Sequence, residues 1–175
     1  MFDWPIRPFA EITSPFPIQE HLANLVRIRA SVDEFLALPD SSVDQDLFQY
    51  EHLRLVCLEL HHLVVALESV CTAETCPEMK ADEWLYLCAA HPQPQNCCAM
   101  DYTFHTLDGA TSLLNSNKYF PSRMAIPNSS LKHFQSIARR LYRIFAHAWW
   151  HHRDVFEEFE VYFSMFILLG YIHYE

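Results

Sequence analysis

The chain has 175 residues, of which 51% are hydrophobic, 14% aromatic and 19% charged, so it suits one globular domain and excludes an intrinsically disordered protein. Its 22 acidic against 12 basic side chains give a net charge of −10, which argues against a general nucleic-acid binder. No apolar run approaches the roughly 18 residues of a membrane span, so we expect no direct membrane insertion.

The first 17 residues contain four of the ten prolines and predict an irregular N-terminal arm, followed by one helical domain over residues 18–175. Trp4, Phe9 and Phe16 are the expected anchors of this arm. The arm has no basic start followed by an apolar run, so it does not resemble a secretory signal, and we expect a cytoplasmic protein.

Helices are expected for most of the remaining chain, because two glycines in 175 residues are too few for a hairpin-rich β fold. Proline-free stretches cover residues 18–38, 40–76, 95–120 and 128–175. Apolar residues recur there at helical spacing, and this pattern predicts an all-α bundle. The three stripes are Ile18, Leu22, Leu25, Val32 and Leu36; Leu53, Cys57, Leu60, Val64 and Leu67; and Ile137, Leu141, Ile144, Phe145 and Ala148.

The apolar pattern of two further segments does not decide their structure. Residues 84–90 fit either a short strand or a buried helical turn. Residues 155–171 are apolar nearly all round and would need burial on most sides. For the Trp149–Trp150 pair, the helical periodicity of the segment and its apolar neighbours favour the core over an exposed interface.

Cysteine and histidine side chains suggest a metal site. Cys71 and Cys76 form a C-x4-C pattern, and His147 precedes His151 and His152 downstream. Two thiolates with two imidazoles suit tetrahedral Zn²⁺, although six cysteines and eleven histidines could also produce this pattern by chance. On a straight helix His151 shares a face with His147, whereas His152 diverges by about 140°. Spacing alone therefore leaves the second histidine open.

Charge is distributed unevenly along the chain. No acidic residue occurs from Gly109 to Arg153, a window with seven basic side chains. Arg139, Arg140 and Arg143 stand on the helix side away from the apolar stripe, where they suit a phosphate or carboxylate ligand. They could equally pair with the protein's own acids. Acidic residues surround the first two expected helices. They form either a docking face for a basic partner segment or simply a solvated surface.

Signals for an enzyme are weak, because a glycine-rich phosphate loop is impossible with two glycines. A zinc hydrolase using His151 or Glu74 would need an open coordination position, and a Cys2His2 set closes the shell.

Long strings of this sequence resemble the Mob/phocein family, and most closely its phocein branch. They are FDWP, YEHLRLVCLEL, CTAETC, YLCAAHPQPQNC, DYTFHTLDGATSLLNSNKYFPSR and RRLYRIFAHAWWHHR, which together cover nearly the whole chain. The resemblance implies an all-α Mob-type bundle with a structural zinc ion. It also implies the ligands, which are Cys71, Cys76, His147 and His152.

By the same resemblance the protein is a non-catalytic adaptor. The phocein branch resembles a subunit of assemblies in which a striatin-type coiled-coil scaffold joins a Ste20-like kinase to a serine/threonine phosphatase. Binding to the phosphatase would be indirect, and any membrane association would come through partners. The alternative is a direct coactivator of an NDR-type kinase.

The resemblance to the kinase-activating branch of the family implies two binding surfaces. That branch binds phosphorylated segments at positions matching Arg139, Arg140 and Arg143. It also has a lysine pair that the segment QPQNCCAMDY lacks here, so an acidic segment could replace the phosphate. The branch docks a basic kinase tail on the region that corresponds to residues 47–59, and Tyr50, Glu51 and Arg54 are expected near that surface.

Overall fold

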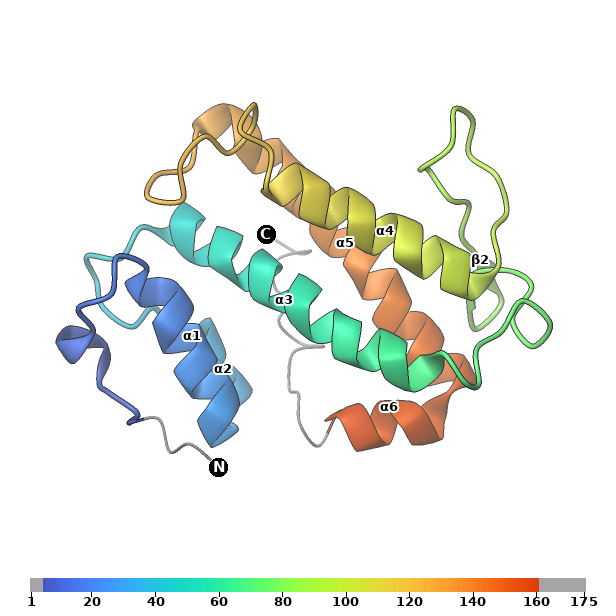
Figure 1. The fold of residues 1–175 in the computed structure, drawn as a ribbon, viewed down its shortest axis with the longest axis horizontal. Coiled ribbons are helices and arrows are strands. Elements are labelled where there is room, and N and C mark those ends of the chain that lie inside the picture. Colours follow the sequence, from blue (N-terminus) through green and yellow to red (C-terminus); the bar gives the residue numbers. More distant parts are fainter. Residues whose placement is uncertain (1–4, 161–175) are drawn as a thin grey trace.

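The computed structural model describes residues 5–160, and these form a helical bundle (Figure 1). After a 3-10 turn at Phe9–Glu11, the six α-helices of these residues are α1 (Pro17–Ile28), α2 (Val32–Leu36), α3 (Gln45–Leu67), α4 (Ala99–Leu114), α5 (Asn128–His151) and α6 (Arg153–Glu160). Two-residue strands β1 (Lys80–Ala81) and β2 (Trp84–Leu85) pair antiparallel, with Lys80 opposite Leu85. The predicted all-α class is confirmed, and residues 84–90 begin as a strand.

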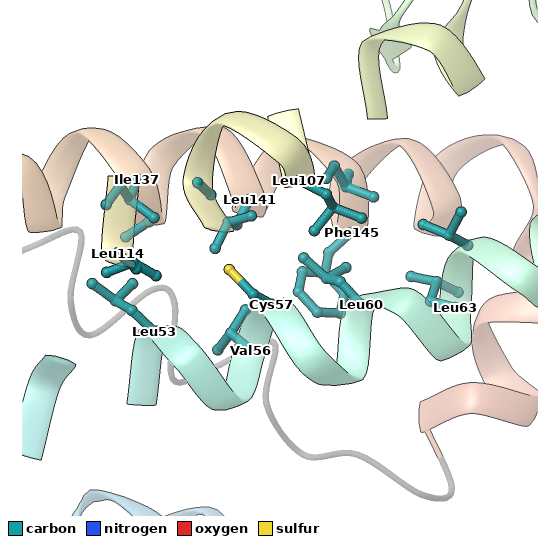
Figure 2. Close-up of a cluster of buried hydrophobic side chains, with 14 of the residues drawn as sticks. Leu53, Val56, Cys57, Leu60, Leu63, Leu107, Leu114, Ile137, Leu141 and Phe145 are labelled. Carbon is teal, nitrogen blue, oxygen red and sulfur yellow. The ribbon is translucent and has the colours of Figure 1, made fainter. Parts of the chain in front are cut away.

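The core lies between the three long helices α3, α4 and α5, which pack against one another (Figure 1). The predicted stripes of α3 and α5 are both buried, from Leu53 to Leu67 and from Ile137 to Ala148. Figure 2 shows Cys57 and Leu60 of α3 facing the α5 side chains Leu141 and Phe145. This packing fixes the C-terminal ends of α3 and α5 relative to each other.

The first predicted stripe is divided between two helices. Arg29 has a φ of 53° and a left-handed conformation that ends α1. A new helix then starts from a capping box, in which the Ser31 backbone N–H donates to the Glu34 carboxylate at 2.8 Å and the Glu34 N–H donates to the Ser31 hydroxyl oxygen. Val32 and Leu36 are consequently only partly buried, because the chain changes direction before them.

The aromatic residues expected to anchor the chain differ in their burial. Phe9 is partly buried against the core, whereas Phe16 is 37% exposed beneath the guanidinium of Arg123, 4.5 Å from its ring centroid. Trp4 lies outside the described residues. Trp149 is partly buried and packs against the core, but Trp150 is 56% exposed, so the expectation of a buried pair is wrong for Trp150.

The apolar segment predicted over residues 155–171 is described only up to Glu160, within α6. Across residues 5–160, no helix combines the length and apolar character that a membrane crossing requires.

Candidate metal centre

The turn that follows α3 places Cys71 and Cys76 side by side. The Cys71 N–H donates to the Leu67 carbonyl at 2.8 Å, and the Cys76 N–H donates to the Thr72 carbonyl at 2.8 Å. Thr75 reinforces the turn, because its hydroxyl donates to the Val70 carbonyl and also accepts the Thr72 N–H. The loop is therefore ordered by its own hydrogen bonds, and both thiols are buried.

The end of α5 places His152. This helix stops at His151, and His152 leaves helical geometry with φ −139° and ψ 52° while its N–H still donates to the Ala148 carbonyl. That departure from the helix lets the rings of His147 and His152 approach to 5.3 Å between centroids. The angle expected on a straight helix does not apply here, because the helix ends between the two residues. His151 stays in the helix and is exposed.

Four donor atoms converge at this point. Cys71 Sγ lies 3.4 Å from His147 Nε2, and Cys76 Sγ lies 3.2 Å from His152 Nε2. All four ligand atoms lie within 4.8 Å of one another. Tetrahedral zinc with ordinary Zn–S and Zn–N bonds separates sulfur from nitrogen by about 3.6 Å. The spacing therefore fits one tetrahedral ion.

A second contact orients His147. Its Nδ1 lies 2.7 Å from the backbone carbonyl of Lys80 in β1. A carbonyl oxygen only accepts, so Nδ1 carries the proton and the lone pair of Nε2 is free to bind a metal ion on the side of Cys71 Sγ. The short β1–β2 hairpin thus orients one member of the donor group although it contributes no donor itself.

Burial keeps both imidazoles in the form that binds metal. It lowers the pKa of His147 to about 4 and also lowers the pKa of His152. Burial, with the adjacent Cys76, raises the pKa of Cys71 to about 12. A divalent cation reverses the preference of the thiols, because a coordinated thiol is deprotonated. The donor set fits a soft divalent ion.

A second group of four donors was missed by the sequence reasoning. Cys88, His91, Cys97 and His105 also place one donor atom each within 4.8 Å of the others. The signal was present as C-x2-H in YLCAAHPQPQNC, a short spacing typical of metal ligands.

The structure separates the three arginines considered above. Arg140 and Arg143 line a cavity of about 230 Å³ between α4, α5 and the segment after β2, whereas Arg139 is not among its lining residues. Arg143 donates to the Tyr102 hydroxyl at 2.9 Å, and its guanidinium lies 4.8 Å from the Tyr86 ring centroid. Within residues 5–160 neither Arg139 nor Arg140 forms an ion pair.

Tyr50, Glu51 and Arg54 lie together on α3, but two of them are inside the protein. Tyr50 is buried, and its hydroxyl donates to the Leu114 carbonyl at 2.8 Å. Glu51 is 4% exposed and accepts two hydrogen bonds from Arg123, the shorter at 2.6 Å. Arg54 is half-buried at 3.6 Å from the Glu51 carboxylate. Arg54 is thus the residue of this set that reaches the surface.

Known proteins share this sequence over most of its length. Residues 24–174 match the Mob1/phocein family. The chain is 48% identical over 159 residues to the MOB kinase activator-like 4 of Drosophila melanogaster, across 90% of this chain and 71% of that protein. It is 46% identical over 159 residues, with the same coverage, to the MOB-like protein phocein of Caenorhabditis elegans. The maintenance of ploidy protein mob1 of Schizosaccharomyces pombe is 30% identical over 114 residues, across 59% of this chain and 52% of that protein.

Proposed function

The chain belongs to the Mob1/phocein family, and we propose that it is a zinc-stabilised, non-catalytic adaptor subunit of a striatin-centred kinase–phosphatase assembly. The observation that supports this most is its identity of 46–48% to a MOB kinase activator-like protein and to a phocein protein over 90% of its length. The proposed partners are a striatin-type coiled-coil scaffold, which binds directly, and a Ste20-like kinase. The serine/threonine phosphatase would join through the scaffold.

Zinc is the ion that we assign to Cys71, Cys76, His147 and His152. Two thiolates and two imidazoles at tetrahedral spacing are the donors of structural zinc sites, and four protein ligands leave no position for a reacting water. The neighbouring candidates for hydrolysis, Glu74 and His151, are both exposed and do not belong to the donor group. When bound, the ion would join the end of α3 to the end of α5, and its role would be structural and not catalytic.

The cavity beside α5 is the proposed binding site for a phosphorylated or acidic segment. Arg140 and Arg143 present two guanidiniums to the same space, and Arg143 is held in place by the Tyr102 hydroxyl. Bidentate hydrogen bonding by arginine suits phosphate and carboxylate groups. Arg139, outside the lining, would contribute mainly through its charge.

A second proposed surface is the exposed face of α3 around Arg54. Tyr50 and Glu51 would act there indirectly, since both are buried and Glu51 holds Arg54 and Arg123 by ion pairs. A partner segment would then contact Arg54 and its exposed neighbours and leave the buried carboxylate untouched.

The alternative function is direct coactivation of an NDR-type kinase, which the name of the Drosophila relative, MOB kinase activator-like 4, favours. The two proposals predict different partners in solution. The purified chain should co-elute with a striatin-type coiled-coil fragment in size-exclusion chromatography if it is a scaffold subunit. Co-elution with an NDR-type kinase domain instead, with increased kinase activity, would replace the first proposal by the second.

A further inference from the structure

We propose that the outer edge of β2 is a docking site for an extended segment of a partner protein, which adds to the β1–β2 hairpin as a third strand. The segment carries apolar side chains at two alternate positions and a lysine or arginine two positions further on. In Figure 1 β2 is labelled at the end of the bundle where α4 begins. The residues of this edge do not line the arginine cavity, and the proposal stands without the adaptor function.

The hairpin leaves backbone groups on one side of β2 without a partner. The Tyr86 N–H donates to the Met79 carbonyl at 2.9 Å, so the backbone of Tyr86 faces the β1 side. Backbone groups alternate in direction along an antiparallel strand, so those of Leu85 and Leu87 point to the opposite side. No residue of the described range 5–160 hydrogen-bonds to them. Leu85 and Leu87 therefore each offer one donor and one acceptor to an added strand.

The loop that follows β2 does not cover this edge. Cys88 and Gln95 exchange backbone hydrogen bonds of 2.8 and 3.2 Å. Cys88 is two residues after Tyr86, so by the same alternation this pair forms on the β1 side of the strand. The outer side next to Leu85 and Leu87 stays open.

The side chains of the open edge are apolar and exposed. Trp84 is 74% exposed, Leu85 42% and Leu87 47%. Alternation places Leu85 and Leu87 on the same face of the sheet, where apolar side chains of an added strand would pack against them as cross-strand pairs. Soluble proteins normally protect an apolar edge strand with charges or with another element, so an open one is the arrangement expected of a surface that a partner covers.

Charge on the hairpin selects the kind of partner. Asp82 and Glu83, in the turn between the two strands, are exposed, and neither forms an ion pair within residues 5–160. Lys80 is the one basic residue in positions 78–88, and its Nζ is already 2.6 Å from the Glu78 carboxylate. A partner segment that brings its own lysine or arginine to Glu83 would complement these two carboxylates.

The same charges disfavour other occupants. A nucleic acid or an anionic membrane surface would be repelled by the carboxylates of Asp82 and Glu83. A second copy of this chain, paired through its own β2 edge, would present residues 82–89, which include no basic side chain. The basic segment of a different protein is therefore the occupant that fits.

Antiparallel addition fixes the order of the segment. The hairpin is antiparallel, and antiparallel pairing is slightly more stable per residue than parallel pairing, so we assign this direction to the added strand. Partner residues opposite Leu87, Leu85 and Glu83 then follow one another at every second position, from the N-terminal to the C-terminal side. The recognised pattern is apolar-x-apolar-x-Lys/Arg.

Selection from a random peptide library displayed on phage, with the full chain purified in the presence of zinc as bait, tests this preference. We expect enrichment of apolar-x-apolar-x-Lys/Arg. A synthetic peptide of the enriched sequence is then titrated by fluorescence anisotropy. Leu85→Lys and Glu83→Lys should each weaken it about tenfold or more, because a cation on the edge repels the basic residue of the peptide. The matched control is Val65→Lys, since Val65 is 70% exposed on α3, and its affinity should equal that of the wild type.

Amide hydrogen exchange of the wild-type chain, followed by NMR, reports the backbone contact without any variant. In the free chain the N–H groups of Leu85 and Leu87 should exchange fast and that of Tyr86 slowly. The bound peptide should slow exchange at Leu85 and Leu87.

Unchanged exchange at both leucines would overturn the proposal. So would equal peptide affinity in Leu85→Lys and the wild type, or a library that yields no enriched sequence. A wild-type dimer that Leu85→Lys dissociates would also overturn it, because the occupant of the edge would then be a second copy of this chain. The peptide replaces the natural partner in these experiments, so failure here is distinct from failure of the adaptor proposal.

Discussion

Cys76 Sγ lies 3.2 Å from His152 Nε2, although 76 positions separate the two residues in the chain. The contact brings the turn after α3 against the residue at which α5 ends. Cys71 and His147 are also 76 positions apart, and Cys71 Sγ lies 3.4 Å from His147 Nε2. The fold thus presents two thiols and two imidazoles to a single point, and an ion there would join the two longest helices of the described chain at their C-terminal ends.

Loss of one ligand at this centre should lower thermal stability. Cys76→Ala leaves three donors, and at zinc concentrations far above the dissociation constant the wild-type chain gains about 4 kcal/mol from binding. For a domain of this size that corresponds to a loss of roughly 10 °C in Tm, measured by circular dichroism at the α-helical band. The control is Cys98→Ser. Cys98 lies outside the donor groups and its sulfur accepts the Asp101 N–H at the start of α4, a role that serine also fills, so this variant should keep the wild-type Tm. An unchanged Tm in Cys76→Ala, together with no zinc in the wild-type protein, would disprove the site.

Arg140, which lines the cavity, and Arg139, which does not, should differ in their effect on peptide binding. Arg140→Ala is expected to weaken a phosphothreonine peptide about tenfold or more, because a hydrogen bond to a charged group contributes roughly 1.5–3 kcal/mol. Arg139→Ala should weaken it no more than about threefold, because Arg139 is outside the cavity lining. Isothermal titration calorimetry at fixed salt compares them. Equal losses in both variants, or no binding of such peptides by the wild type, would contradict the assignment.

Glu51→Ala should destabilise the protein by about 2–3 kcal/mol. The substitution removes a buried carboxylate that pairs with Arg123 and Arg54, and it leaves two guanidiniums without their partner. Glu157→Ala is the matched control, since Glu157 and its partner Arg153 are both exposed on α6, and it should cost roughly 0.5 kcal/mol or less. Urea unfolding followed by tryptophan fluorescence measures both. A similar small loss in the two variants would show that the Glu51 network contributes little.

Gly109→Ala should stabilise the free protein. Gly109 lies within α4, and a Cβ at this position meets no heavy atom within 4 Å, so alanine gains helix propensity without a clash. The expected gain is about 0.5–1 kcal/mol in urea unfolding. A loss of stability would mean that the space beside Gly109 is occupied in solution.

Periodicity of apolar residues was sufficient to predict the bundle, because the stripes of α3 and α5 each bury one face of a long helix. It could not locate the break at Arg29, where a left-handed residue and the Ser31 capping box divide one apparent stripe into two helices. Trp150 was misplaced for a related reason. Its neighbours in the sequence are apolar, but apolar neighbours do not show whether another helix covers its side of α5, and Trp150 is 56% exposed.

The proposed metal ligands show what helical spacing alone cannot predict. The choice between His151 and His152 depends on the residue at which α5 ends, and helical spacing assumes that the helix continues. Family resemblance pointed to His152, and the end of α5 at His151 is what brings the His152 ring into the donor group. The second donor group was missed because His105 lies on α4 and not in the loop that contains the other three donors, and helical spacing does not show how that loop folds back onto the helix.

The adaptor role is tested most directly by affinity capture of the tagged protein from its native cells, with partners quantified by mass spectrometry. The proposal predicts a striatin-type coiled-coil scaffold at a stoichiometric amount, accompanied by a Ste20-like kinase and serine/threonine phosphatase subunits. Recovery of an NDR-type kinase as the main partner, with no coiled-coil scaffold, would contradict it and make direct kinase coactivation the function of this chain.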